Sequence, residues 1–237
     1  MSKKALIALC IVVLLPIVGY LLVKEISEES LTMPKRYFAD TVINQVVDGK
    51  TVTDTVWHSV KNITLTNQLG EQVSLDDIKG SIIIADFFFT RCPSICPTLT
   101  KNMKELQDAM KMKDFRKMIE SNYVRFISFS VDPERDSAAA LKKYADKFGV
   151  NHDTWWFLTG PRESIYDFAF NELKIGLQDG EGIDSNFIHT EKFVLLDKDR
   201  VVRGYYNGLD SASLSKLAED LTLLILERDP KKKRSIF

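Results

Sequence analysis

Residues 81–103 read SIIIADFFFTRCPSICPTLTKNM, and we expect the fold to be built around this stretch. Its apolar run from Ile82 to Phe89 is typical of a central strand that is buried on both faces. Asp86 interrupts this run, and we expect its carboxylate to face solvent or a hydrogen-bond partner. Pro97 is favoured in the first turn of a helix and predicts that a helix follows. Two cysteines therefore lie where a strand leads into a helix.

On either side of this stretch, strand patterns and helix patterns alternate. Residues Asn62 to Leu75 alternate apolar and polar side chains around a turn at Asn67 to Gly70, which predicts a hairpin. Apolar spacing predicts further strands at 123–131, 155–158, 187–196 and 201–206, and helices at 97–119, 137–148, 162–173 and 211–228. This alternation predicts an α/β fold in which helices flank both faces of a parallel or mixed central sheet.

The N-terminus carries a long apolar segment. Lys3 and Lys4 precede the uncharged run from Ala5 to Val23, and a helix of that length is about 30 Å long, enough to cross a hydrocarbon core. Because positive flanks stay in the cytoplasm, we expect an uncleaved transmembrane helix with the N-terminus inside and the remaining chain exported. A cleaved signal peptide is the alternative.

These patterns divide the 237-residue chain into four parts. We expect the N-terminal lysines and anchor at 1–23, a tether at 24–57, a globular domain at 58–228 and a basic tail at 229–237. The net charge of −1 argues against nucleic-acid binding, and the short cluster from Lys231 to Arg234 is typical of a solvated tail.

Cys92 and Cys96 are the residues on which chemistry is most expected. Export would place them in an oxidising compartment, where neighbouring thiols either form a disulfide or serve redox or metal chemistry. Cys10 lies in the apolar N-terminal run and cannot meet them. A disulfide that closes so short a loop stabilises a fold weakly. The helix start should favour a thiolate at Cys96, and three intervening residues suit two thiolates that grip a metal as well as a closable disulfide.

A third metal ligand could come from a histidine. Two thiolates are soft ligands that suit Cu(I), and an added imidazole also accommodates Cu(II). His58 and His152 lie in polar segments where a surface or packing role is expected, whereas His189 follows a glycine-rich loop and begins a predicted strand. His189 is therefore the preferred candidate, although its position alone does not make it a ligand.

Three segments together resemble a known family. FFFTRCPSICPTLT, SVDPERDS and IHTEKFVLLDKDRVVRGYY resemble the signature blocks of the Sco/SenC family, membrane-anchored copper chaperones of cytochrome c oxidase assembly. The resemblance extends from about Asn62 to Leu226. It implies a thioredoxin-like fold with an added β-hairpin.

The resemblance also implies a site and a function. It makes Cys92, Cys96 and His189 the ligands of one copper ion, Cu(I) or Cu(II), and it gives Asp132 either a supporting role beside the site or that of a solvated strand-end residue. The implied function is delivery of copper to the copper A centre of a cytochrome c oxidase subunit. The implied partners are that subunit and other copper chaperones or thiol reductants, and the implied location is the periplasmic side of the inner membrane.

Other functions remain open at this point. A thiol-disulfide oxidoreductase acting on exported proteins would use the same cysteines, with His189 tuning a thiol. Such folds normally carry a proline before the strand that faces the cysteines, and the chain has none between Pro161 and Pro230. A peroxidase would use Cys92 with Arg91, and a purely structural or redox-sensing role is the remaining alternative. A chaperone, rather than an enzyme, is the preferred reading.

Overall fold

The computed structural model describes residues 12–20, 32–47, 50–110, 123–176 and 190–228. The chain divides into two compact units, Met1–Pro34 and Lys35–Phe237. In the first unit, residues 12–20 are helical. No helix within the described ranges is both long enough and apolar enough to cross a membrane. Most of the predicted anchor, residues 5–11 and 21–23, lies outside those ranges.

The second unit contains a two-stranded hairpin and a mixed sheet. The strands of this unit are β1 (Ala39–Val47), β2 (Lys50–Trp57), β3 (Thr64–Asn67), β4 (Gln72–Ser74), β5 (Ile82–Phe88), β6 (Val124–Ser130), β7 (Trp155–Thr159), β8 (Lys192–Leu196) and β9 (Val202–Asn207). Over the described ranges, β3 to β9 form a seven-stranded sheet in the order β4-β3-β7-β6-β5-β8-β9. The central strands β5, β6 and β7 are parallel, and β8 runs antiparallel to β5.

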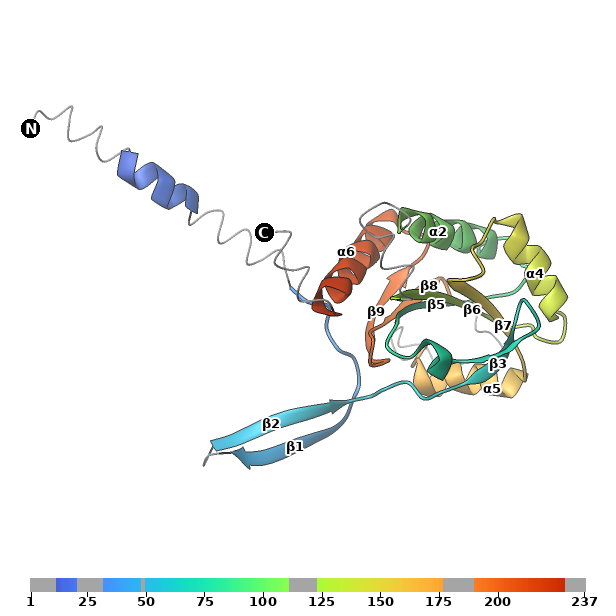
Figure 1. The fold of residues 1–237 in the computed structure, drawn as a ribbon, viewed down its shortest axis with the longest axis horizontal. Helices are drawn as coiled ribbons and strands as arrows, with labels where there is room; N and C mark the ends of the chain where they lie inside the picture. The colour runs from blue at the N-terminus through green and yellow to red at the C-terminus, as the bar shows by residue number, and fades with distance from the viewer. Residues whose placement is uncertain (1–11, 21–31, 48–49, 111–122, 177–189, 229–237) are drawn as a thin grey trace, which may run out of the picture. The chain divides into compact units, whose positions relative to one another are not determined.

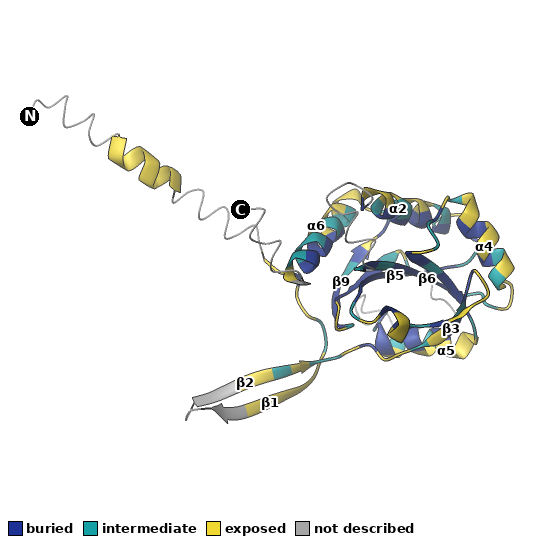
Figure 2. Ribbon diagram, viewed as in Figure 1, coloured by how far each residue is buried: buried dark blue, intermediate teal, exposed yellow. Residues whose placement is uncertain are grey.

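Helices cover both faces of this sheet, as Figure 1 shows. They are α2 (Cys96–Ala109), α4 (Ala138–Lys147), α5 (Arg162–Asp167) and α6 (Ser211–Arg228), with a 3-10 turn η1 (Leu75–Ile78) and a π-helical turn η2 (Phe168–Glu172). Helices α2, α4 and α6 lie over one face, and α5 lies over the other. Every residue of β5 is buried, because apolar layers cover it on both sides (Figure 2).

The predicted element order is confirmed over the described residues. The hairpin predicted at 62–75 is β3 and β4, paired antiparallel, and the central strand is β5. The helix predicted at 97–119 begins one residue earlier, at Cys96, and is described up to Ala109. The helix predicted at 162–173 continues from α5 into η2.

Part of the predicted tether forms a β-hairpin. Strands β1 and β2 pair antiparallel, with Val42 opposite Thr55 and Ile43 opposite Asp54. The hairpin is connected to the domain at its base, where Tyr37 N–H donates to the Val202 carbonyl (3.0 Å). Val42 and Ile43 are exposed farther along this hairpin. The segment therefore has regular structure of its own before the sheet begins.

Candidate metal centre

Cys92 and Cys96 both lie beyond the C-terminal end of β5, as their sequence position predicts. The chain leaves β5 at Phe88, bends through residues 89–95, and enters α2 at Cys96, with Pro97 second in the helix. Both cysteines are in the thiol form and buried, and Cys96 N–H donates to Cys92 Sγ at 3.4 Å. The bend thus holds two sulfur atoms beside each other under the first turn of α2.

The environment of Cys96 differs from the predicted one. A helix N-terminus alone would favour the thiolate, but Cys96 is only 1% exposed. Burial raises the pKa of the Cys96 thiol, and its hydrogen bond with Cys92 raises it further. Desolvation therefore outweighs the helix dipole, and Cys96 is a neutral thiol near pH 7. A metal that binds this sulfur as thiolate must displace its proton.

Hydrogen bonds also hold the first turn of α2, which begins at Cys96. Thr100 Oγ1 donates to the Cys96 carbonyl (2.9 Å) and lies 2.9 Å from the Tyr144 hydroxyl on α4. Burial raises the pKa of Tyr144, so this hydroxyl stays protonated. The first turn of α2 is thereby connected to α4 through two buried hydroxyl groups, a contact that no local sequence pattern predicts.

Asp86 lies on the same face of β5 as the cysteines. Its neighbours in alternation, Ile84 and Phe88, belong to the core layer that contains Cys92 and Cys96. Asp86 is 1% exposed, and neither carboxylate oxygen has a hydrogen-bond partner in the described part of the chain. The carboxylate therefore does not face solvent. Burial raises the pKa of Asp86 to about 7, and the nearby Ser128 hydroxyl is the side-chain group that lowers its pKa.

Two aspartates that follow β6, Asp132 and Asp136, differ in exposure and in their contacts. Asp132 has a 23% exposed side chain, and its carboxylate contacts Arg135 at 3.3 Å. Asp136 is 1% exposed and accepts hydrogen bonds from Thr90 and from Ser130 Oγ. Thr90 is two residues from Cys92, so the carboxylate that touches the cysteine bend is Asp136. Sequence reasoning missed Asp136, because only its contact with Thr90, 46 residues away, identifies it.

His189 lies outside the described residues. In the ranges that are described, no group of three or more His, Cys, Asp or Glu side chains is arranged to hold a metal ion. His58 contacts Asp40 (3.1 Å) and Glu172 (3.4 Å), and His152 contacts Asp146 (2.9 Å). The two described histidines therefore have the packing and surface roles expected of them. The described part of the site consists of Cys92 and Cys96, a donor pair that fits a soft metal such as copper.

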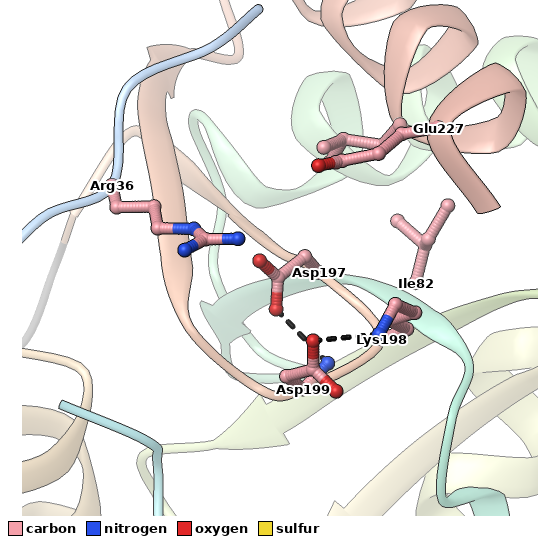
Figure 3. A pocket seen from close by; sticks show the side chains of 7 residues that line it. Arg36, Ile82, Asp197, Lys198, Asp199 and Glu227 are labelled. Atoms are coloured by element: carbon pink, nitrogen blue, oxygen red, sulfur yellow. Dashed lines mark hydrogen bonds and ion pairs between the residues drawn. The ribbon is translucent and has the colours of Figure 1, made fainter. Parts of the chain in front are cut away.

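A small pocket of about 130 Å³ lies at the other end of β5. Figure 3 shows its charged lining, in which Asp199 N–H donates to Asp197 Oδ1 (3.0 Å) and Lys198 pairs with Asp199 (2.8 Å). Ile82, the first residue of β5, also lines it. The length of β5, seven residues at ~3.3 Å each, separates this pocket from the cysteines by roughly 20 Å. These contacts are those of a tight hairpin turn.

Comparison with known proteins identifies a family for this chain. The family model described as SCO1/SenC matches residues 55–225. A SCO1/SenC family lipoprotein from Bacillus anthracis is 31% identical, with a TM-score of 0.59 over 71% of this chain and 95% of that chain. BsSco, described with a disulfide switch and as a member of the Sco family of cytochrome c oxidase assembly proteins, is 37% identical, with a TM-score of 0.57 over 71% and 94%.

A third solved structure is that of Bradyrhizobium japonicum ScoI with copper bound. It is 28% identical, with a TM-score of 0.52 over 69% of this chain and 98% of that chain. The shared fold confirms the predicted thioredoxin-like architecture with its mixed sheet and hairpin. The match covers the β5–α2 bend and the strands around it. The chain therefore belongs to the SCO1/SenC family.

Proposed function

We propose that this protein is a membrane-anchored copper chaperone that binds one copper ion through Cys92, Cys96 and His189. It delivers the ion to the copper A centre of a cytochrome c oxidase subunit during assembly. The observation that carries the proposal is the pair of buried thiols at the β5–α2 bend, joined by the 3.4 Å contact from Cys96 N–H to Cys92 Sγ. Copper is the cargo, and its release requires stepwise replacement of these ligands by those of the acceptor.

The sulfur pair suits a soft, exchangeable metal. Thiolates prefer Cu(I), and a third imidazole ligand extends the site to Cu(II). Because Cys96 is protonated when metal-free, binding releases a proton and becomes stronger as pH rises. The copper-bound ScoI structure, 28% identical, supports copper as the metal.

The position of β8 supports His189 as the third ligand. Val194 of β8 pairs with Ala85 of β5 in antiparallel register, so the N-terminal end of β8 lies beside the C-terminal end of β5. Thr190, whose hydroxyl accepts the Lys192 N–H (3.1 Å), leads into β8 from this end. His189 directly precedes Thr190 in the sequence, and this neighbourhood supports it as the third ligand.

The N-terminal segment supports a location at the membrane surface. The run from Ala5 to Val23 after Lys3 and Lys4 would anchor the protein with its copper domain on the periplasmic side of the inner membrane. The B. anthracis relative is described as a lipoprotein, which also indicates membrane association in the family. Residues 1–23 would then serve as the anchor, and 58–228 as the copper domain.

Copper titration of the reduced full chain tests the proposal. Absorption and EPR spectra would be recorded for wild type, Cys92→Ser, Cys96→Ser and His189→Ala. We expect either cysteine change to abolish binding of one equivalent, and His189→Ala to weaken Cu(II) binding and alter its EPR spectrum, since a ligand is lost.

Matched controls are available in the same chain. Cys10→Ser removes the thiol outside the site, and His152→Ala removes an imidazole that contacts Asp146. Both should leave the spectra unchanged. Wild-type spectra in His189→Ala would remove this histidine from the site, and stoichiometric binding after loss of either site cysteine would refute the copper site.

A second candidate function is thiol-disulfide exchange, which the description of BsSco with a disulfide switch favours. The pair would become a Cys92–Cys96 disulfide while a disulfide in an exported target becomes two thiols, so two electrons and two protons pass to the target. Turnover of a model disulfide by the copper-free protein measures this activity. Catalysis without copper, combined with an absence of copper binding, would replace the chaperone proposal with this one.

A further inference from the structure

Asp136 connects the end of β6 to the bend that carries Cys92. The carboxylate is 1% exposed. Asp136 Oδ2 accepts the Thr90 N–H at 3.1 Å, and Oδ1 accepts the Thr90 hydroxyl at 2.5 Å. Asp136 Oδ2 also accepts the Ser130 hydroxyl at 2.6 Å. Hydrogen bonds to a buried carboxylate are stronger than neutral ones, so these contacts hold the bend firmly.

The two cysteines are held by different parts of the fold. Cys96 belongs to α2, and Thr100 Oγ1 caps its carbonyl at 2.9 Å. Cys92 precedes the helix, and its N–H donates to the Phe89 carbonyl at 3.2 Å. Its sulfur accepts the Cys96 N–H at 3.4 Å, and its backbone is held through residues 89 and 90, of which Thr90 is fixed by Asp136.

We infer that Asp136 is the positioning residue that holds Cys92 at the right place relative to Cys96. The inference concerns the same site as the proposed function and deepens it. Two sulfur ligands must both lie about 2.3 Å from one metal ion, the distance known from zinc–cysteine sites. A small displacement of one sulfur therefore weakens the site. Asp132 does not have this role, because its carboxylate contacts Arg135 and its side chain is 23% exposed.

Alkylation of the reduced, metal-free full chain tests the inference without copper. Iodoacetamide labelling followed by peptide mass spectrometry gives separate rates for Cys92 and Cys96. In Asp136→Asn we expect the Cys92 rate to rise about tenfold or more, because a charge-assisted hydrogen bond to the bend is lost. The Cys96 rate should change much less, because α2 still holds it. A general loss of stability would raise both rates together.

Thr90 variants test the same contact from its other end. Thr90→Val removes the hydroxyl donor and keeps the shape, and Thr90→Ser keeps the donor. We expect Thr90→Val to raise the Cys92-to-Cys96 rate ratio and Thr90→Ser to restore the wild-type ratio. Asp132→Asn is the matched control and should leave the ratio unchanged.

The Cu(II) EPR spectrum provides a second measurement for the same variants. We expect Asp136→Asn and Thr90→Val to change it, and Thr90→Ser and Asp132→Asn to keep it. If Asp136→Asn does not fold, the Thr90→Val and Thr90→Ser pair decides the inference alone. An unchanged rate ratio in Thr90→Val, or an equal change in Asp132→Asn, would overturn it. If wild type binds no copper, the proposed function fails while the alkylation ratios still test the role of Asp136.

Discussion

Asp86→Asn should remove a pH-dependent loss of stability from this protein. Asp86 lies in the middle of β5, is 1% exposed, and its oxygens are without hydrogen-bond partners in the described ranges. Burial raises its pKa from 3.8 to about 7, and the neighbouring Ser128 hydroxyl offsets this only in part. An isolated buried charge is costly, so the folded protein holds Asp86 as the neutral acid.

The direction of the effect follows from proton binding. Between pH 4 and 7 the folded state keeps a proton on Asp86 that the unfolded chain has released, so stability falls as pH rises. The pKa difference of about 3 pH units, at ~1.4 kcal/mol per unit, corresponds to about 4 kcal/mol lost between pH 4 and 7. The loss is nearly complete by about pH 8 and constant above it. Asparagine has no proton to lose, so its variant lacks this slope.

Urea unfolding of the full chain measures the effect. Wild type and Asp86→Asn would be compared at several pH values between 5 and 8, and the free energy of unfolding of the variant would be subtracted from that of wild type. Other titrating groups cancel in this difference, as does any constant cost of burying the amide. We expect the difference to fall by about 2–3 kcal/mol between pH 5 and 7. A difference that stays constant over this range would refute the burial argument.

Three further changes test buried polar contacts. Arg203→Met leaves buried Asp197, now 2.9 Å from the guanidinium, without that partner, and should cost about 3–5 kcal/mol in thermal unfolding; a loss below ~1 kcal/mol would contradict this. Tyr144→Phe removes the hydroxyl 2.9 Å from Thr100 Oγ1 and should cost about 1–2 kcal/mol in urea unfolding, whereas a stabilised variant would exclude a favourable contact. Ser137→Ala removes the N-cap of α4 and should cost about 1 kcal/mol, with faster amide exchange confined to its first turn.

The helices and strands that could be predicted are those whose buried face is visible in the spacing of apolar residues along the sequence. The leucines of 211–228 recur at helical spacing, and α6 has those bounds, with Leu217, Leu221 and Leu224 buried. The apolar residues of β5 are buried on both faces, which a run without alternation predicts. The position of Cys92 and Cys96 was predicted correctly because the strand before them and the helix after them were predicted correctly.

The hairpin at 39–57 shows a signal that was interpreted too weakly. Valine, isoleucine and threonine are frequent in 39–47 and 50–57, and Asp48-Gly49 lies between the two runs. Asp-Gly between two runs of strand-forming residues is a strong hairpin signal, but the polar composition favoured a tether. Strands β1 and β2 pair in these two runs. The polar composition of this segment was therefore a poorer guide than its Asp-Gly turn signal, because the two runs pair as strands.

The supporting residues of the site could not be predicted, because their contacts are long-range. Asp136 is 46 residues from Thr90, and Tyr144 is 44 residues from Thr100. In the sequence, Asp132 and Asp136 are equivalent members of one acidic block, and only packing makes one exposed and the other buried. Asp86 was recognised as unusual, but the lack of hydrogen-bond partners for its two oxygens depends on the residues that pack against this face of β5 from other elements.

The chemistry of the cysteine pair follows from a balance between two opposing effects. The N-terminus of α2 favours negative charge on Cys96, and burial opposes it more strongly, so the metal-free site holds a thiol there. Since the thiolate is the form that oxidants and disulfides react with, burial lowers the reactivity of Cys96. A soft metal can take the place of the proton by bonding directly to the sulfur. Under the proposed function, copper binding at Cys96 therefore includes displacement of this proton, and it requires that Cys92 is held beside Cys96.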